Sequence, residues 1–150
     1  MGDLDFFIKL DSPVEKLIPM LMDFEMMPSI LPRQLKSVKI LQETDNGTIT
    51  EEIIVFKTLV KNEIKQTSLH KKTSNNNIYT EILSGPAAGT KINTDLKKYE
   101  MNTEVHIQID LKLSLKARFL SPIIKKVYRH MLTGVLLKID NLIMENKNEF

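Results

Sequence analysis

The feature of this sequence that most constrains its fold is a long amphipathic stretch near the C-terminus, from Ser121 to about residue 146. Ser121 followed by Pro122 predicts the start of a helix, because proline has no N–H to lose in the first turn and serine can cap it. Apolar residues then recur at the i, i+3, i+4, i+7 spacing of one broad helical face. They are Ile123, Ile124, Val127, Met131, Leu132, Val135, Leu136, Ile139, Leu142 and Ile143. Such a helix needs a large apolar surface opposite it.

Six predicted strands joined by short turns precede the helix and can supply that surface. The last of them has the clearest pattern, since apolar residues from Val105 to Leu115 alternate with polar ones. Asp45-Asn46-Gly47 predicts a tight hairpin between the first two strands. Successive strands with short connections predict an antiparallel sheet that has one covered face and one solvent face. The predicted strands are 35–43, 48–57, 60–72, 78–83, 90–100 and 102–115.

The first 33 residues predict one more strand and two short helices. Residues 4–10 alternate as a strand does. Ser12, with Pro13 after it and Glu15 three residues on, has the pattern of a capping box and predicts a helix that starts there. A second short helix or turn is predicted in the proline-bracketed stretch 23–33. The whole order, β-α-α-β6-α, predicts an α+β fold with about seven strands.

Methionines concentrate around the first two helices. Met20, Met22, Met26 and Met27 lie close together in the sequence. Their unbranched, polarizable side chains suit a surface that adapts to ligands of different shape, and equally suit filling gaps in a small core. The sequence leaves both roles open.

The length and net charge of the chain limit the class of protein that it can be. A chain of 150 residues with 42% hydrophobic content is expected to form one domain spanning residues 1–150. The net charge of +2 is too small to indicate a nucleic-acid partner. The first residues lack the layout of a signal peptide and no apolar run is long enough to cross a bilayer, so a cytoplasmic protein is expected. The oligomeric state is left open.

Motifs for metals and cofactors are missing from the sequence. There is no cysteine, which excludes disulfides, thiol catalysis and sulfur ligands. The three histidines do not have the spacing of metal ligands. The sequence has no glycine-rich phosphate loop and no nucleophile elbow. We therefore expect neither a metal nor a cofactor, and the sequence assigns no catalytic residue.

Residues 60–72 depart from the pattern of a plain core strand. If their charged face is outside, the covered face carries Asn62, Gln66 and His70. A dry core does not tolerate such a face unless its polar groups find partners. A cavity that holds water or a ligand would satisfy them, whereas a position at a sheet edge would simply leave them wet. The pattern favours the cavity.

Two single residues bear on this cavity. Gly134 in mid-helix costs about 1 kcal/mol relative to alanine, which indicates close packing of the helix on the sheet or room for a bound molecule. His70 is the one histidine expected on a covered face. The sequence predicts no carboxylate beside it, so a structural hydrogen-bonding role is favoured over that of a general base.

A basic run crosses the last strand and the start of the long helix. It consists of Lys112, Lys116, Arg118, Lys125, Lys126 and Arg129. A solvated face is the favoured interpretation. Transient contact with an anionic membrane surface, or with a phosphate-bearing ligand, is the alternative.

The order of elements resembles the helix-grip fold of the START and birch-pollen-allergen (SRPBCC) superfamily. The opening strand and helix start in residues 6–17 carry the likeness, as do Phe24-Glu25-Met26-Met27-Pro28 with Pro32, and Gly85-Pro86 with Gly89-Thr90. The sequence is most similar in character to the polyketide cyclase/dehydrase and coenzyme-Q-binding branch. This resemblance implies a curved sheet that grips the long helix around an elongated cavity for an apolar molecule.

The leading hypothesis is binding or transport of a hydrophobic small molecule, such as a lipid, an isoprenoid quinone or a polyketide-like compound. A cyclase/dehydrase-type enzyme with His70 or an inward carboxylate as general acid–base is one alternative. A membrane-docking or stress-related interaction protein is another. The predicted apolar wall is Ile53, Val55, Ile64, Ile92, Leu96, Ile107, Ile109, Leu111, Leu132, Leu136 and Ile139, and the predicted polar contacts are Asn62, Gln66, His70 and Thr94.

Overall fold

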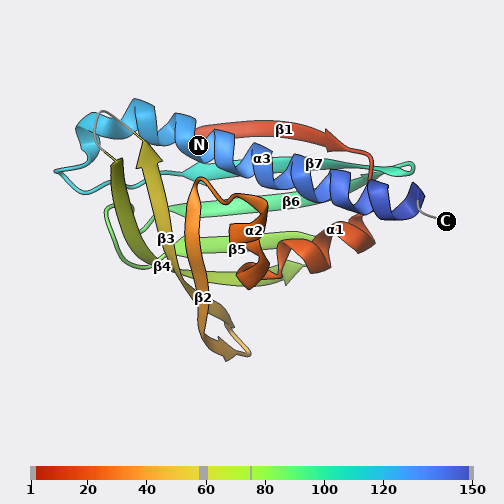
Figure 1. Ribbon diagram of the computed structural model, residues 1–150, viewed down its shortest axis with the longest axis horizontal. Helices are drawn as coiled ribbons and strands as arrows, with labels where there is room; N and C mark the ends of the chain where they lie inside the picture. The colour runs from red at the N-terminus through yellow and green to blue at the C-terminus, as the bar shows by residue number, and fades with distance from the viewer. Residues whose placement is uncertain (1–2, 58–60, 75, 149–150) are drawn as a thin grey trace.

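The computed structural model describes residues 3–57, 61–74 and 76–148, and the side chains of residues 56, 57, 61, 62, 147 and 148 are outside that description. The elements follow the predicted order β-α-α-β6-α (Figure 1). They are β1 (Leu4–Leu10), α1 (Val14–Leu21), the 3-10 turn η1 (Phe24–Met26), α2 (Met27–Ile30), β2 (Leu35–Thr44), β3 (Gly47–Lys57), β4 (Lys61–Ser74), β5 (Asn77–Ile82), β6 (Lys91–Tyr99), β7 (Asn102–Asp110), the 3-10 turn η2 (Arg118–Leu120) and α3 (Ser121–Asn148). The predicted α+β fold class is confirmed.

The seven strands form one antiparallel sheet in the order β1-β7-β6-β5-β4-β3-β2. Strands β2 to β7 form a meander, and β1 lies at the edge of the sheet, where it pairs with β7 and places Leu4 opposite Ile109. The predicted hairpin at residues 45–47 is present, since Thr44 pairs with Gly47. The sheet curves around α3, which runs along its concave face, while η1 and α2 pack against β2 and α1 contacts α3 and β6 (Figure 1).

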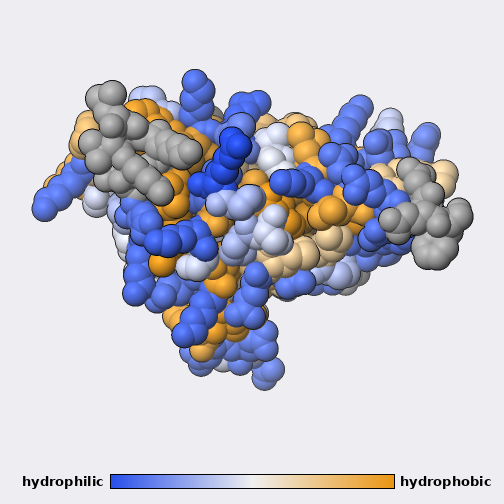
Figure 2. Space-filling model, viewed as in Figure 1, coloured by the Kyte–Doolittle hydropathy of each residue, from blue (hydrophilic) through white to orange (hydrophobic). Residues whose placement is uncertain are grey.

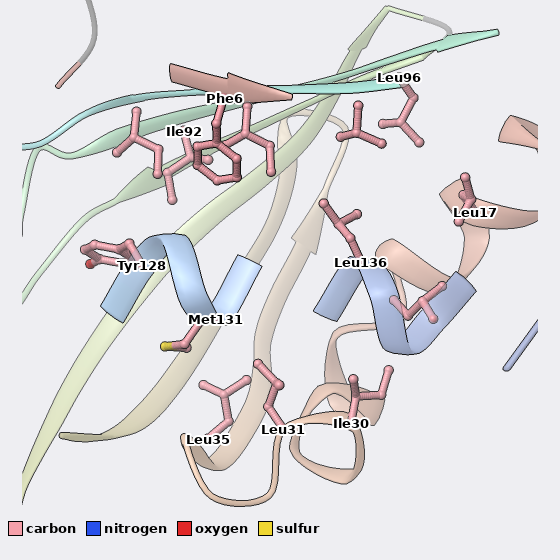
Figure 3. Close-up of a cluster of buried hydrophobic side chains, with 14 of the residues drawn as sticks. Phe6, Leu17, Ile30, Leu31, Leu35, Ile92, Leu96, Tyr128, Met131 and Leu136 are labelled. Atoms are coloured by element: carbon pink, nitrogen blue, oxygen red, sulfur yellow. The ribbon is translucent and has the colours of Figure 1, made fainter. Parts of the chain in front are cut away.

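The core lies between the sheet and α3. Side chains from β1 and β6, such as Phe6 and Leu96, point toward α3, while Leu31 and Leu35 approach the helix from its other side (Figure 3). Ile139 on α3 has no exposed surface. The predicted apolar stripe of α3 is buried only in part: Ile124, Met131, Leu136, Ile139 and Ile143 are buried, whereas Ile123 and Leu142 are exposed.

The last strand is shorter than its alternation predicts. β7 ends at Asp110, not at Leu115. Its two neighbours explain this, because β1 begins at Leu4, opposite Ile109, and β6 begins at Lys91, opposite Asp110. Among the described residues, the backbone beyond Asp110 has no strand to pair with, and the alternating residues that follow form a loop.

The start of α1 also differs from the predicted capping box. Pro13, not Ser12, is the N-cap, and it makes no side-chain capping bond. Ser12 is instead held by α3, because its amide N–H donates to Asp140 Oδ1 at 2.8 Å and the amide of Asp11 donates to Asp140 Oδ2 at 3.1 Å. The buried Asp140 thus satisfies its charge with backbone amides and ties the start of α1 to the long helix.

Gly134 faces the segment after α2 rather than the sheet. A Cβ at this position would meet Leu31 Cδ2 at 3.4 Å, an ordinary van der Waals distance, so the packing here does not require glycine. Among the residues described, none of the helices combines the length and the apolar content needed to cross a membrane.

Candidate functional site

A cavity of about 190 Å³ lies between the sheet, the α1–α2 segment and the middle of α3. Most of its wall is apolar and comes from every layer of the fold: Leu21, Phe24, Met27, Leu31, Leu35, Val38, Ile54, Ile78, Ile82, Ile92, Met131, Leu132 and Val135. Its polar wall comes mainly from β3, β4 and β5: Glu52, Gln66, Ser68, His70, Thr80 and, from β6 and α3, Thr94 and Tyr128. The polar groups are thus gathered on one half of the sheet.

The predicted site residues fall into three groups. Those that line the cavity are Gln66, His70, Ile92, Thr94 and Leu132. Those that are packed in or against the hydrophobic core without lining the cavity are Ile64, Leu96, Ile107, Ile109, Leu136, Ile139 and Leu111, the last of which follows the end of β7. Those that lie elsewhere are Ile53 and Val55, on the opposite face of β3. The side chain of Asn62 lies outside the described residues.

The face of β3 is the main correction to the predicted site. Thr50, Glu52 and Ile54 are buried on the inner face, whereas Ile53 and Val55 are half-buried on the outer one. Three consecutive apolar residues, 53–55, do not reveal which face is covered, and a shift of one residue exchanges the two. Ile53 and Val55 are expected on the inner face because they are apolar, whereas the inner face in fact carries Thr50 and Glu52 with Ile54.

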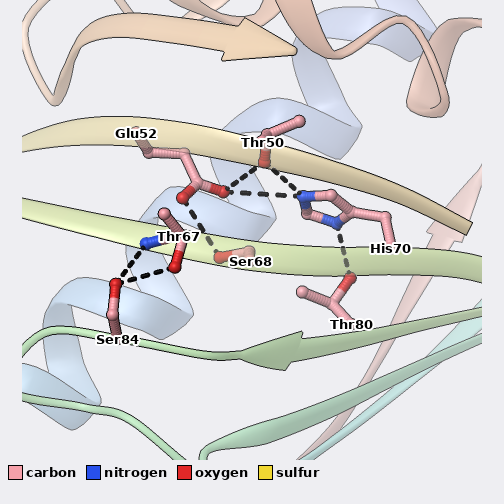
Figure 4. A network of polar contacts seen from close by, with 7 residues as sticks. All are labelled: Thr50, Glu52, Thr67, Ser68, His70, Thr80 and Ser84. Carbon is pink, nitrogen blue, oxygen red and sulfur yellow. Dashed lines mark hydrogen bonds and ion pairs between the residues drawn. The ribbon is translucent and has the colours of Figure 1, made fainter. Parts of the chain in front are cut away.

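This correction brings a carboxylate to His70. Glu52 is only 8% exposed, and its Oε1 lies 3.5 Å from His70 Nε2. The hydroxyl of Thr50 donates to Glu52 Oε1 at 2.9 Å, and the hydroxyl of Ser68 donates to Oε2 at 3.1 Å (Figure 4). The expectation that His70 has no carboxylate partner is therefore wrong.

The hydrogen bonds decide which nitrogen of His70 carries a proton. The single proton of the Thr50 hydroxyl is donated to Glu52, so Thr50 Oγ1 accepts from His70 Nε2, 2.9 Å away. Nε2 is then protonated. Nδ1 lies 2.9 Å from Thr80 Oγ1, which donates to it when the imidazole is neutral and accepts from it when the imidazole is charged. Both protonation states of His70 are satisfied.

Two aromatic residues complete the polar end of the cavity. The ring of Phe24 stacks on His70, with centroids 4.3 Å apart and planes 22° from parallel. Burial, and then the negative charge of Glu52, raise the pKa of Tyr128 well above its ordinary value. Tyr128 is therefore a neutral phenol at physiological pH.

The site offers hydrogen-bonding groups and a carboxylate that can accept a proton. Within the described ranges, no three histidine, aspartate or glutamate side chains come together as metal ligands. Thr50, Glu52, Ser68, Thr80 and Tyr128 were not predicted as site residues. Thr80 and Ser68 had a usable indication, since both alternate with inward residues of their strands, whereas Glu52 depended on the ambiguous face of β3.

Comparisons with known proteins place this fold. No protein-family model matches the sequence, and no curated protein matches it either. Solved structures do match along nearly the whole chain. The protein TTHA0849 from Thermus thermophilus has a TM-score of 0.79 at 11% identity, over 95% of this chain and 97% of that one. A START superfamily protein from Mycobacterium smegmatis has a TM-score of 0.72 at 14% identity, over 95% and 97% of the two chains.

An enzyme structure is similar to the same extent. The Zhui aromatase/cyclase from Streptomyces sp. R1128 has a TM-score of 0.72 at 10% identity, over 92% of this chain and 90% of that one. The chain therefore has the START-like helix-grip fold, as the resemblance in sequence indicated. At these identities the likeness extends to the fold and not to the site.

Proposed function

We propose that this protein binds a hydrophobic small molecule in the cavity between its sheet and α3. The observation that carries the proposal is the composition of the cavity wall, which is apolar except for one cluster of polar groups around Glu52 and His70. Concave sites for small molecules have this composition, with a few polar groups that orient the ligand. The residues proposed to contact it are Gln66, His70, Ile92, Thr94 and Leu132, together with Glu52 and Tyr128.

The volume of the cavity limits the size of the ligand. Its volume of about 190 Å³ is below the roughly 300–1,000 Å³ of typical drug-sized sites. An engineered apolar cavity of about 150 Å³ admits benzene, so a ring or a short chain is the proposed occupant. A whole lipid or isoprenoid tail requires wall side chains to move, and the flexible Met27 and Met131 are the residues suited to that.

Extraction of the purified protein into organic solvent, followed by mass spectrometry, tests the proposal directly. A second measurement is titration with an apolar fluorescent probe. We expect Leu132→Trp to fill the cavity and abolish probe binding. Leu137→Trp is the matched control, because Leu137 lies on the same helix but is 45% exposed. Protein that is always empty and binds no probe would refute the proposal.

A second candidate function is general acid–base catalysis on an aromatic or polyketide-like substrate. The specific observation in its favour is that an inward carboxylate, Glu52, faces the cavity beside His70. Both ring nitrogens of His70 are engaged by Thr50 and Thr80, so Glu52 is the better placed proton acceptor. One of the similar structures is titled an aromatase/cyclase, which is a property of that protein.

Turnover measurements separate catalysis from binding alone. If the protein is an enzyme, Glu52→Gln lowers kcat by a factor of about 10²–10⁴ while the protein still binds substrate. Glu51→Gln, at the neighbouring position on the outer face of β3, serves as the control. A panel of aromatic and polyketide-like compounds that bind but are never converted would leave binding as the function.

A further inference from the structure

We infer that the cavity takes a neutral ligand with a hydroxyl group and rejects carboxylates. This inference rests on the proposed binding function and concerns the same site. It follows from the charge and the acceptor capacity of Glu52, which is the only acidic residue among the described residues that line the cavity.

Glu52 has acceptor capacity left for a ligand. An ionised carboxylate offers about four lone-pair positions. Among the described residues, Oε1 accepts from Thr50 and faces His70, while Oε2 accepts from Ser68. A further position on Oε2 can therefore receive the hydroxyl of a ligand. A hydrogen bond to a charged acceptor in an apolar surrounding is stronger than one between neutral groups.

The same carboxylate opposes an anionic ligand. No lysine or arginine is found among the described residues that line the cavity. His70 is the one lining group there that can become cationic, and its Nε2 already faces Glu52. A ligand carboxylate would thus enter a space of low dielectric that holds a negative charge and offers no separate counter-ion, which is unfavourable.

Three matched probes test the inference: 4-ethylphenol, 4-ethyltoluene and 4-ethylbenzoate, titrated at pH 7 by calorimetry or ligand-observed NMR. The phenol is neutral and the benzoate ionised at this pH. We expect the phenol to bind at least about tenfold more tightly than either of the other two. Equal binding of phenol and hydrocarbon, or of phenol and benzoate, overturns the inference and leaves the proposed function intact. Failure of all three to bind overturns the inference, while solvent extraction and titration with the apolar fluorescent probe decide the proposed function separately.

The variant Glu52→Gln sharpens the test, since it keeps the shape of the side chain and removes the charge. Discrimination against the benzoate should fall at least about tenfold. Glu51→Gln should leave it unchanged, because Glu51 lies on the outer face near Lys65. Discrimination that survives in Glu52→Gln contradicts the role of this carboxylate. The probe series on the unaltered protein decides the question even if the variant does not fold.

A different part of the molecule carries a second, independent inference. We propose that the loop between β7 and α3, residues 111–120, docks on an anionic lipid membrane. Leu115 and Phe119 are 79% and 78% exposed, more than nearly all other large apolar residues described. Figure 2 shows apolar surface at this end of the molecule, around the start of α3.

Leu115 and Phe119 point outward from a loop whose backbone is fixed by hydrogen bonds. The amide of Ser114 donates to the carbonyl of Pro86 at 2.9 Å, and the amide of Lys112 donates to Thr90 Oγ1 at 2.9 Å. Ala117, between the two exposed residues, is buried. The exposure of Leu115 and Phe119 is therefore a property of an ordered loop, and it costs apolar contact with water unless something covers them.

The positive charge around the loop indicates an anionic membrane as its binding partner. The sequence has no acidic residue between Asp110 and Asp140. Lys112, Lys116 and Arg118 are exposed on the loop itself. Two further basic residues are partly engaged, since Lys125 lies 4.0 Å from Asp3 and Arg129 lies over the ring of Phe6. Apolar side chains that project from a basic surface match an anionic interface, where the chains insert and the cations meet lipid head groups.

Vesicle co-sedimentation tests this docking. Vesicles of phosphatidylcholine with about a third phosphatidylserine should bind the protein at low salt and release it as salt rises, because the attraction is screened. Lys116→Gln with Arg118→Gln should weaken binding about fivefold for each charge removed. Leu115→Ser with Phe119→Ser should weaken it at least tenfold. Met101→Ser, at an equally exposed residue in the β6–β7 turn, is the control.

Two outcomes overturn the docking proposal. One is equal binding to vesicles of pure phosphatidylcholine, which would remove the role of charge. The other is unchanged binding of the Leu115→Ser, Phe119→Ser variant, which would show attraction to the basic run alone, without insertion of the loop.

Discussion

The two halves of the sheet present opposite chemistry to the same helix. On β6 and β7 the inner face is mostly apolar and buried, as Leu96, Val105 and Ile107 show, with Thr94 and Thr103 as its polar residues. On β3 and β4 the inner face carries Glu52, Ser68 and His70 and lines the cavity. Both halves follow the same two-residue alternation and lie in one continuous sheet.

This contrast separates the part of the sheet that stabilises the fold from the part that forms the site. Apolar residues against α3 contribute burial, which is the dominant favourable term in folding. Polar residues on the inner face contribute little unless each is paired, and here Thr50, Ser68 and His70 are paired through Glu52. The polar half should therefore tolerate conservative changes better than the apolar half.

The largest expected effect is on stability in the apolar half. Ile107→Ala should lower the free energy of unfolding by about 2–5 kcal/mol, because it leaves a cavity in a fully buried core. Ser68→Ala, at a position of similar burial in the polar half, should cost only about 1 kcal/mol. Urea denaturation of both variants measures the difference. Similar losses would mean that both halves contribute equally.

The second largest effect is expected from loss of the Glu52 carboxylate. Glu52→Ala should lower the free energy of unfolding by about 1–3 kcal/mol, since it leaves buried donors from Thr50 and Ser68 without their acceptor. Glu51→Ala should stay within about 0.5 kcal/mol, because its exposed ion pair with Lys65 contributes little. Urea denaturation applies here too. An equally stable Glu52→Ala variant would show that water replaces the carboxylate at no cost.

Alkaline pH should destabilise the protein through Tyr128. Its pKa is raised in the folded state by burial and by Glu52, so above about pH 10 the unfolded chain loses the phenol proton first. Stability is then full below that pH and falls as pH rises, by up to about 1.4 kcal/mol per unit. Tyr128→Phe should remove the part of this pH dependence of stability that comes from Tyr128. Thermal unfolding of both proteins between pH 8 and 11 checks it, and identical slopes would contradict it.

The smallest expected effect concerns the contact between His70 Nδ1 and Thr80. Thr80→Val keeps the side-chain shape and removes the hydroxyl 2.9 Å from Nδ1. We expect a loss of about 0.5–1.5 kcal/mol in the free energy of unfolding. NMR of the imidazole should also report a change in the tautomer balance of His70, which a purely steric effect would not produce. An unchanged imidazole spectrum would contradict the hydrogen bond between Thr80 and Nδ1.

Sequence patterns were sufficient for the architecture because the architecture depends on local periodicity. The alternation in β7, the hairpin at residues 45–47 and the apolar stripe of α3 each specify an element and a covered face. The inward polar face of β4 was also predictable, since Gln66 and His70 alternate with charged residues that must be outside. Elements and their order follow from such patterns when one side of each is strongly apolar or charged.

The site required the tertiary structure for two physical reasons. A run of apolar residues such as 53–55 is compatible with either face, so only the packing of β3 decided that Glu52 points inward. The pairing of strands then decided that Glu52, Ser68 and His70, which are separated in the chain, meet at one point. The sequence by itself therefore determined a sheet that grips a helix and a covered face that is partly polar. Only the fold determined that this face holds a carboxylate, and that Leu115 stands exposed on a loop rather than inside a strand, because no described strand pairs with the chain beyond Asp110.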